Sequence, residues 1–288
     1  MKLKINRHVK SFIKVILSFA ALYFVYTKID IKEVINVYRQ SNPFFLVIAL
    51  LFFTISKIIA AYRLNGYLKA IDIFISETAN LRLYLLGMFY NLFLPGGIGG
   101  DGYKIYLLNR HFNVKARRIF WAIFFDRLNG VLALVILATL FFYFLGGLVM
   151  VKWFLWILIP LGIFVFYYII RRFFSYFRKI VMPGTFQSLL VQVSQTLSAF
   201  FIMLALGIDN YHVAYLFIFL LSSIIAMMPV TIGGIGSREI AFLYGAKMLA
   251  LNTSVSVALS LMFYLITLLV SFFGIFLSFK PEHILKHS

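Results

Sequence analysis

Hydrophobic residues occur along this chain in long blocks separated by short polar connectors, and the lengths of these blocks predict membrane-spanning helices. A helix needs about 20 predominantly apolar residues to cross the hydrocarbon core of a bilayer. Six blocks are interpreted as full spans, and they cover residues 11–27, 43–61, 119–145, 153–170, 185–206 and 255–279. Polar connectors are expected between them, including residues 28–42 and the loop that follows residue 61.

Two further apolar blocks are each interrupted by a proline and a cluster of glycines. The first covers residues 76–94 and resumes at 101–111, and the second covers 211–228 and resumes at 237–249. Proline blocks a continuing helix and glycine disfavours one, so the backbone must break at both places. The first returning segment, 101–111, is too short to cross the bilayer. The pattern predicts two re-entrant hairpins, for about eight hydrophobic segments in all. The predicted orientation of the chain would not change if the arms crossed fully, because each hairpin then contributes two crossings.

The composition confines the chain to one class of protein. Hydrophobic residues make up 63% of the sequence, charged residues only 12%, and the mean hydropathy is +0.97. A soluble domain carries roughly a quarter charged residues. The expected fold is therefore an all-α polytopic membrane protein, with residues 1–288 forming a single integral membrane domain. The sequence has no cysteine, which excludes disulfides and thiolate metal sites.

The basic residues predict how the chain is oriented. Its net charge is +18, which in a membrane protein reflects basic cytoplasmic loops rather than affinity for nucleic acid. With both termini placed in the cytoplasm, 18 of the 27 basic residues fall on the inside and five on the outside. We therefore expect a multi-pass protein of the cell (inner or cytoplasmic) membrane with both termini cytoplasmic.

This layout makes the two hairpins enter from opposite faces of the membrane. Each hairpin follows one span and precedes another, which gives a first repeat at about residues 43–145 and a second at about 185–279. Such an order is typical of inverted-topology repeats, whose broken helices meet near the midplane.

The glycine clusters at the two breaks are candidates for substrate binding. They contain Gly96, Gly97, Gly99, Gly100, Gly233, Gly234 and Gly236. The alternative is simple close packing of helices through small residues. Two dense clusters, each preceded by proline and followed by charge, favour broken helices. The returning helices are expected to begin at the capping residues Asp101 and Ser237, with free N–H groups that suit a phosphate or carboxylate.

Several charged residues fall at membrane depth, where charge is costly and usually functional. Asp101, Lys104, Arg238 and Glu239 are candidates for substrate binding, and Asp126 with Arg127 for a supporting charge pair. The structural alternative is that these charges only hold the hairpins in place. Lys14 and Lys57 are expected to extend toward the membrane surface.

The positions of these charges predict a mixed-sign pocket, that is, a binding pocket lined by both basic and acidic side chains. Arg238 would hold a phosphate, and Asp101 or Glu239 would meet a cationic headgroup or a coupled proton. No DxD, HExxH or phosphate-loop motif occurs, and His283 and His287 lack a third ligand nearby. We therefore expect a transporter rather than an enzyme, with no catalytic residues, no metal and no cofactor.

The motifs resemble the transmembrane region of the lysylphosphatidylglycerol synthase/flippase family. The matching stretches are NLFLPGGIGGDGYKIYLL at 91–108, the helix with Asp126-Arg127, MPVTIGGIGSREIAFLY at 228–244, and Tyr62-Arg63-Leu64. In bifunctional members this region moves an aminoacylated phospholipid between leaflets, and a soluble domain makes that lipid. No such domain is found here, so the resemblance does not imply synthase activity. Lys104 replaces a usual arginine and Asp126 a usual glutamate, changes that bear on substrate identity.

The resemblance implies a lipid flippase or transporter that moves a phospholipid or another lipid-linked substrate between leaflets. Its partners would be membrane lipids and a lipid-synthesising enzyme. Two alternatives stay open. One is a membrane-embedded accessory protein or transferase in polyprenol-linked glycan or cell-envelope assembly. The other is a structural partner protein without transport activity.

Overall fold

A computed structural model describes residues 31–93, 99–146, 149–227 and 236–279, together with 23, 26, 27, 284 and 285. Every regular element in these ranges is a helix. Four helical segments are long and apolar enough to cross a membrane, at residues 43–69, 116–144, 181–205 and 253–278. The all-helical membrane class is therefore confirmed. The expected first span, residues 11–27, lies almost wholly outside the described residues.

Two long helices form the centre of the molecule, α3 (Pro43–Lys69) and α8 (Val181–Ala205). They pack along each other through small residues. Ala49 on α3 and Ser198 on α8 have no exposed surface, and the Ser198 hydroxyl donates to the Ala49 carbonyl oxygen at 2.8 Å. Helices within a bilayer associate through such close packing and interhelical hydrogen bonds, because lipid supplies no hydrophobic driving force between them.

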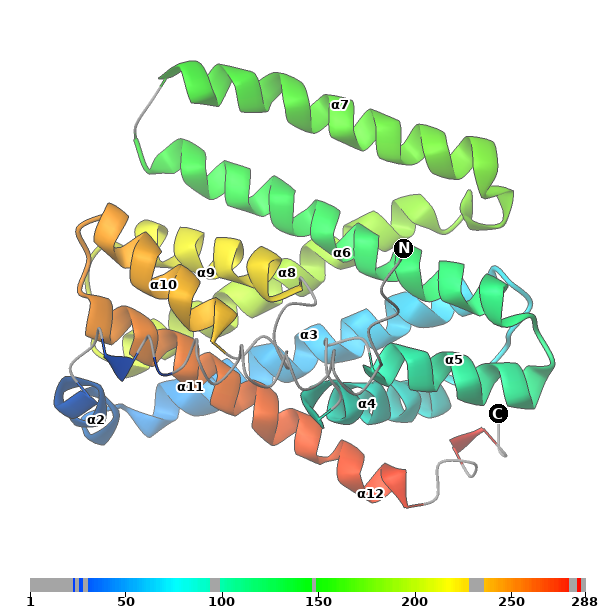
Figure 1. Cartoon of the computed structure of the whole chain (residues 1–288), viewed down its shortest axis with the longest axis horizontal. Coiled ribbons are helices and arrows are strands. Elements are labelled where there is room, and N and C mark those ends of the chain that lie inside the picture. The colour runs from blue at the N-terminus through cyan, green and yellow to red at the C-terminus, as the bar shows by residue number, and fades with distance from the viewer. Residues whose placement is uncertain are drawn as a thin grey trace, which may run out of the picture.

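Further long helices flank this central pair (Figure 1). They are α6 (Ala116–Phe144) and α11 (Thr253–Phe272), which continues into the short α12 (Gly274–Ser278). The outermost helix is α7 (Val149–Phe173), which lies beside α6 and contains the expected span at 153–170. A 3-10 turn, η1 (Ser175–Phe177), leads from α7 toward α8.

Two pairs of shorter helices occupy opposite ends of the molecule (Figure 1). One pair is α4 (Glu77–Phe93) with α5 (Gly99–Phe112), and the other is α9 (His212–Met227) with α10 (Ser237–Met248). The returning helices α5 and α10 have 14 and 12 residues. At 1.5 Å per residue they extend only about 20 Å, less than the hydrocarbon thickness of about 30 Å. The breaks at residues 94–98 and 228–235 lie outside the described residues.

The helix contacts on the two sides of the α3–α8 pair correspond to each other. Helix α4 packs on α3, α5 and α11, while α9 packs on α8, α10 and α6. Likewise, α6 contacts α3, α5 and α8, while α11 contacts α8, α10 and α3. Exchanging α3, α4, α5 and α6 for α8, α9, α10 and α11 thus reproduces the same set of contacts.

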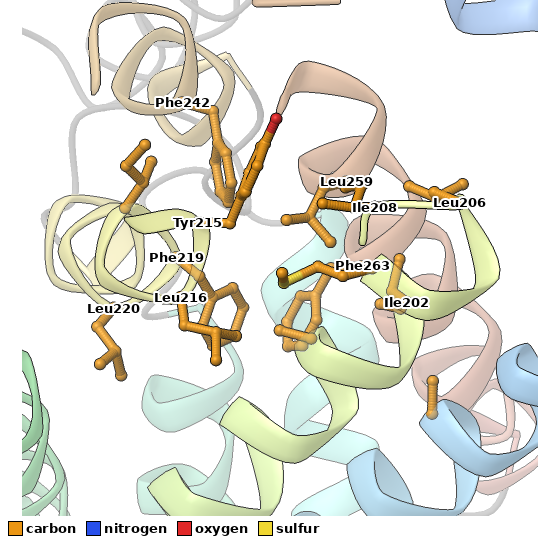
Figure 2. Close-up of a cluster of buried hydrophobic side chains, with 14 of the residues drawn as sticks. Ile202, Leu206, Ile208, Tyr215, Leu216, Phe219, Leu220, Phe242, Leu259 and Phe263 are labelled. Carbon is orange, nitrogen blue, oxygen red and sulfur yellow. The ribbon is translucent and has the colours of Figure 1, made fainter. Parts of the chain in front are cut away.

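Buried hydrophobic side chains form two main clusters. One lies around α8, α9 and α11 and includes Phe219, Phe263 and Ile202, as Figure 2 shows. The other joins the second half of α3 to α4, α5 and the first half of α6, and includes Leu64, Leu86 and Leu108. Each cluster anchors one of the two short-helix pairs to the long helices.

Two segments expected to be connectors are helical instead. Residues 62–69 continue α3, and their polar side chains have partners inside the fold: Asn65, for example, donates to the Ile75 carbonyl oxygen at 3.1 Å. The connector at 28–42 contains α2 (Ile31–Arg39), whose Tyr38 hydroxyl donates to the Ala258 carbonyl oxygen at 2.9 Å. Hydropathy alone did not predict these helices, because it does not show that polar side chains such as Asn65 and Tyr38 have hydrogen-bond partners inside the fold.

Candidate functional site

A cavity of about 320 Å³ lies between the two short-helix pairs. Its lining comes from eight helices, α3 to α6 and α8 to α11. The charged residues of this lining are Lys57, Arg63, Asp101, Lys104, Asp126, Arg127 and Arg238. The volume is at the lower end of the range for small-molecule pockets.

Arg63 on α3 and Asp126 on α6 form a buried, two-point ion pair. Arg63 Nε lies 2.7 Å from Asp126 Oδ1, and Nη2 donates to Oδ2 at 3.3 Å. Both side chains are only 6% exposed. A third nitrogen, Nη1, donates to the Ser188 hydroxyl on α8 at 2.7 Å. Buried charge is tolerated when it is paired and hydrogen-bonded, so this cluster ties three helices together at one side of the cavity.

Asp101 on α5 has two basic partners. Its Oδ1 lies 3.2 Å from Lys104 Nζ on the next turn, and its Oδ2 forms an ion pair with Arg127 Nε on α6. Asp126 and Arg127, which the sequence suggested as a supporting charge pair, each meet a charged partner elsewhere: Asp126 meets Arg63, and Arg127 meets Asp101. Adjacent residues of a helix point in different directions, so each meets a partner on a separate helix.

Helices α4 and α5 approach so closely that only glycine fits at their contact. A Cβ atom on Gly100 would overlap the backbone carbonyl of Gly87, and one on Gly87 would overlap the Lys104 side chain. The Gly100 N–H donates to Asn91 Oδ1 at 2.8 Å. Gly99 is the first residue of α5 and Asp101 lies in its first turn, so Asp101 is not the N-cap that was expected.

Helix α10 begins after a glycine in a left-handed conformation. Gly236 is the N-cap, with φ of +84°, and the expected cap Ser237 is the first helical residue. The Gly236 N–H donates to Glu239 Oε2 at 2.7 Å, and the Ser260 hydroxyl on α11 donates to Oε1 at 2.8 Å. Glu239 is 2% exposed and is not among the residues that line the cavity. Its carboxylate holds the start of α10 against α11.

Arg238 lines the cavity. Its Nη2 donates to the Ser223 hydroxyl at 2.7 Å, and the guanidinium lies 4.6 Å from the ring centroid of Phe263 and 5.4 Å from that of Phe219. Its Nε is buried and has no hydrogen-bond partner among the described atoms. The aromatic rings hold the guanidinium in place without neutralising its charge.

Lys57 also lines the cavity, which corrects the expectation that it reaches the membrane surface. Its ammonium lies 4.4 Å from the ring centroid of Phe53. Since α3 continues to Lys69, Lys57 lies near the middle of a 27-residue helix rather than near its end. The snorkelling hypothesis depended on a helix that ended at residue 61. The spacing of Phe53, Lys57 and Ala60 marks one helical face, and this was the signal available in the sequence.

The structure brings most of the described candidates together. Asp101, Lys104 and Arg238 line one cavity with Asp126 and Arg127, while Glu239 turns away from it. Two residues missed as candidates, Lys57 and Arg63, line the same cavity. Four predicted glycines lie outside the described residues, namely Gly96, Gly97, Gly233 and Gly234.

The cavity contains more basic than acidic groups. Among the described residues, five basic side chains line it against two acidic ones, a formal excess of three positive charges. Arg63 pairs with Asp126, and Lys104 and Arg127 pair with Asp101. Lys57 and Arg238 form no ion pair with any described acid. Such an arrangement can compensate an anionic ligand.

The chain matches one protein-family model and one curated protein. The family model described as the lysylphosphatidylglycerol synthase TM region matches residues 11–274. The UPF0104 membrane protein PH1989 of Pyrococcus horikoshii is 27% identical over 116 residues, which are 40% of this chain and 35% of that protein. The match thus spans about a third of the relative's length. No solved structure matches the chain.

Proposed function

Because the chain belongs to the family of lysylphosphatidylglycerol synthase transmembrane regions, we propose that it moves a phospholipid or another lipid-linked substrate between the leaflets of the cell membrane. The observation that carries this proposal is the charged cavity between the two short-helix pairs. A lipid that changes leaflet must bring its polar headgroup through hydrocarbon, where unpaired charge is costly. A cavity lined by charge offers the headgroup an alternative to that environment.

The correspondence of helix contacts supports an inverted repeat. Helices α3 to α6 and α8 to α11 make matching contacts, and both sets line the cavity. In transporters built from such repeats, the substrate site lies near the midplane at the repeat interface, and one repeat rocks against the other to alternate access. We infer that the α4–α5 and α9–α10 pairs are the re-entrant hairpins of the two repeats.

Reconstitution in liposomes tests the proposed function. The purified protein would be incorporated into vesicles that contain a headgroup-labelled phospholipid, and a membrane-impermeant reagent would report the label in the outer leaflet. We expect the pool protected in the inner leaflet to become accessible in protein-containing vesicles and to stay protected in protein-free vesicles.

A matched pair of arginine variants shows whether the cavity is responsible. Arg238→Gln removes a cavity charge, whereas Arg171→Gln changes an exposed arginine near the end of α7. Only the first should slow lipid movement. Sugar transfer to a lipid carrier without lipid movement would instead support a transferase.

A further inference from the structure

We propose that the cavity binds a lipid phosphate monoester, a compact headgroup with up to two negative charges, in preference to a headgroup that carries an amine. This inference rests on the proposed lipid transport, and it departs from the mixed-sign pocket that the sequence suggested. It depends on which cavity charges are already compensated by the protein and which are not.

The two acids of the cavity are already engaged by basic side chains. Asp126 accepts two hydrogen bonds from Arg63, at 2.7 and 3.3 Å. Asp101 contacts both Lys104 and Arg127. An incoming ammonium group would have to displace one of these cations and leave it buried without its partner, which is strongly unfavourable.

No other described acid is placed to meet an amine in the cavity. Glu239 caps α10 and bonds Ser260 outside the lining. Glu33 accepts from Asn252, and Glu77 pairs with Lys69 in an exposed contact. The two interrupted segments, residues 94–98 and 228–235, contain no acidic residue in the sequence. The broken ends of the hairpins therefore cannot supply a carboxylate.

Lys57 and Arg238 are the cavity cations that form no ion pair with a described acid, and the one acid that attracts Arg238 electrostatically is Glu239, whose carboxylate is held by Gly236 and Ser260. They stand on neighbouring rings of one aromatic cluster: Lys57 lies over Phe53 and Arg238 over Phe263, and the two ring centroids are 5.4 Å apart. The buried Nε of Arg238 lacks an acceptor among the described atoms. Phosphate oxygens would supply that acceptor together with the compensating charge.

Charge and size together select the headgroup. A phosphate monoester carries about −1.5 to −2 at pH 7 and three acceptor oxygens. Its charge can therefore offset most of the formal excess of three positive charges, and its oxygens provide acceptors for Lys57 and Arg238, which both line the cavity. A phosphodiester carries a single negative charge and offsets less, and an added amine works against the same excess. The volume of about 320 Å³ also favours a compact headgroup.

Binding of short-chain, water-soluble lipids to the purified full-length protein tests this preference without requiring transport. The probes are dihexanoyl phosphatidic acid, dihexanoyl phosphatidylglycerol and its lysyl ester, with farnesyl phosphate and farnesol as a second, isoprenoid set. Affinities would be measured by titration at pH 7.5. We expect each monoester to bind about tenfold or more tightly than its comparison lipids, as an added charge-assisted hydrogen bond implies. The two sets show whether diacylglycerol or prenyl phosphate is the better ligand.

Variants assign the preference to the two cations. Lys57→Gln and Arg238→Gln should each reduce the preference for the monoester, and the double variant should abolish it. Lys69→Gln, which removes a cation from an exposed pair, should leave it unchanged. The comparison of lipids on the unaltered protein decides the question even if a variant fails to fold.

The outcomes separate this inference from the proposed function. Equal or tighter binding of the lysyl ester, or a preference that survives in the double variant, would overturn the inference. If liposomes show lipid movement but no monoester binds preferentially, the inference is wrong and the transport function stands. If the monoester binds preferentially but no lipid moves, the binding site stands and the transport function is wrong.

Discussion

Several buried charges in this protein are held by partners on other helices, and Asp101 has in addition a partner on its own helix, Lys104. Arg63 joins α3 to α6 through Asp126 and to α8 through Ser188. Asp101 joins α5 to α6 through Arg127. Each of these side chains therefore fixes the rotation of its helix about the helix axis. It also determines which charge that helix presents to the cavity.

Arg63→Gln should destabilise the protein strongly. It leaves Asp126 buried without its cation, and breaking a buried pair typically costs about 3–5 kcal/mol. The matched control is Lys69→Gln, whose partner Glu77 belongs to a pair in which both side chains are 45% exposed. An exposed pair contributes less than about 1 kcal/mol. Unfolding of both variants in detergent micelles would measure the difference, and equal losses would contradict the structural role of the Arg63 pair.

Glu239→Gln should lower stability without changing the preference among headgroups. Glu239 accepts from the Gly236 N–H and from Ser260, and loss of its charge weakens both hydrogen bonds by about 1–3 kcal/mol in total. The variant would be compared in thermal unfolding and in lipid binding with Glu77→Gln, which changes an exposed carboxylate. A changed preference for amine-bearing lipids would show that Glu239 meets the substrate.

Among the helices, the short pairs depend on close backbone contact. The start of α5 lies on Gly87 of α4, with the Gly100 N–H bonded to Asn91. The start of α10 depends on the positive φ of Gly236. Because the returning helices are short, these contacts at their first residues position the charges that follow them, Asp101 and Arg238.

Gly100→Ala should push α5 away from α4. The added Cβ meets backbone atoms of Gly87, which cannot rotate aside as a side chain can, and overpacking of this kind costs about 1–3 kcal/mol. In the same helix, a Cβ on Gly102 meets no atom within 4 Å. Gly102→Ala should therefore be neutral, or stabilising by up to about 1 kcal/mol. Thermal unfolding and lipid movement would both be measured, and equal behaviour of the two variants would exclude the close contact as the cause.

For the molecule as a whole, the central question is which face of the membrane each hairpin enters. Helix α8 separates the connector at Arg178 from the connector at Asp209, and it is one of the helices long enough to span. From the distribution of basic residues we expect the first of these connectors on the cytoplasmic side. On that expectation the two proposed hairpins would enter from opposite sides, as inverted repeats require.

Topology reporters provide the test of this arrangement. We expect fusions at Arg178 and at the C-terminus to report the cytoplasm and a fusion at Asp209 to report the opposite side. The reason is the bias of basic residues toward cytoplasmic connectors. An external signal at Arg178 would remove the inverted-repeat argument, because the hairpins would no longer face opposite sides.

The sequence by itself determined the membrane class, the long apolar helices, and the short helices α4, α5, α9 and α10 on either side of the glycine clusters. These follow from local properties: the length of apolar blocks, and the conformational effects of glycine and proline. It also singled out Asp101, Lys104 and Arg238, which line the cavity, because charge in an apolar stretch is visible without a fold.

Only the tertiary structure decided which charges meet. The Arg63–Asp126 pair joins residues 63 positions apart, and no local pattern encodes such a contact. The continuation of α3 to Lys69 placed Lys57 in the cavity, and the capping of Gly236 turned Glu239 away from it. The direction of a side chain depends on the rotation of its helix, and that rotation is set by packing against helices distant in the sequence. The net charge of the residues that line the cavity therefore depends on how the helices are assembled.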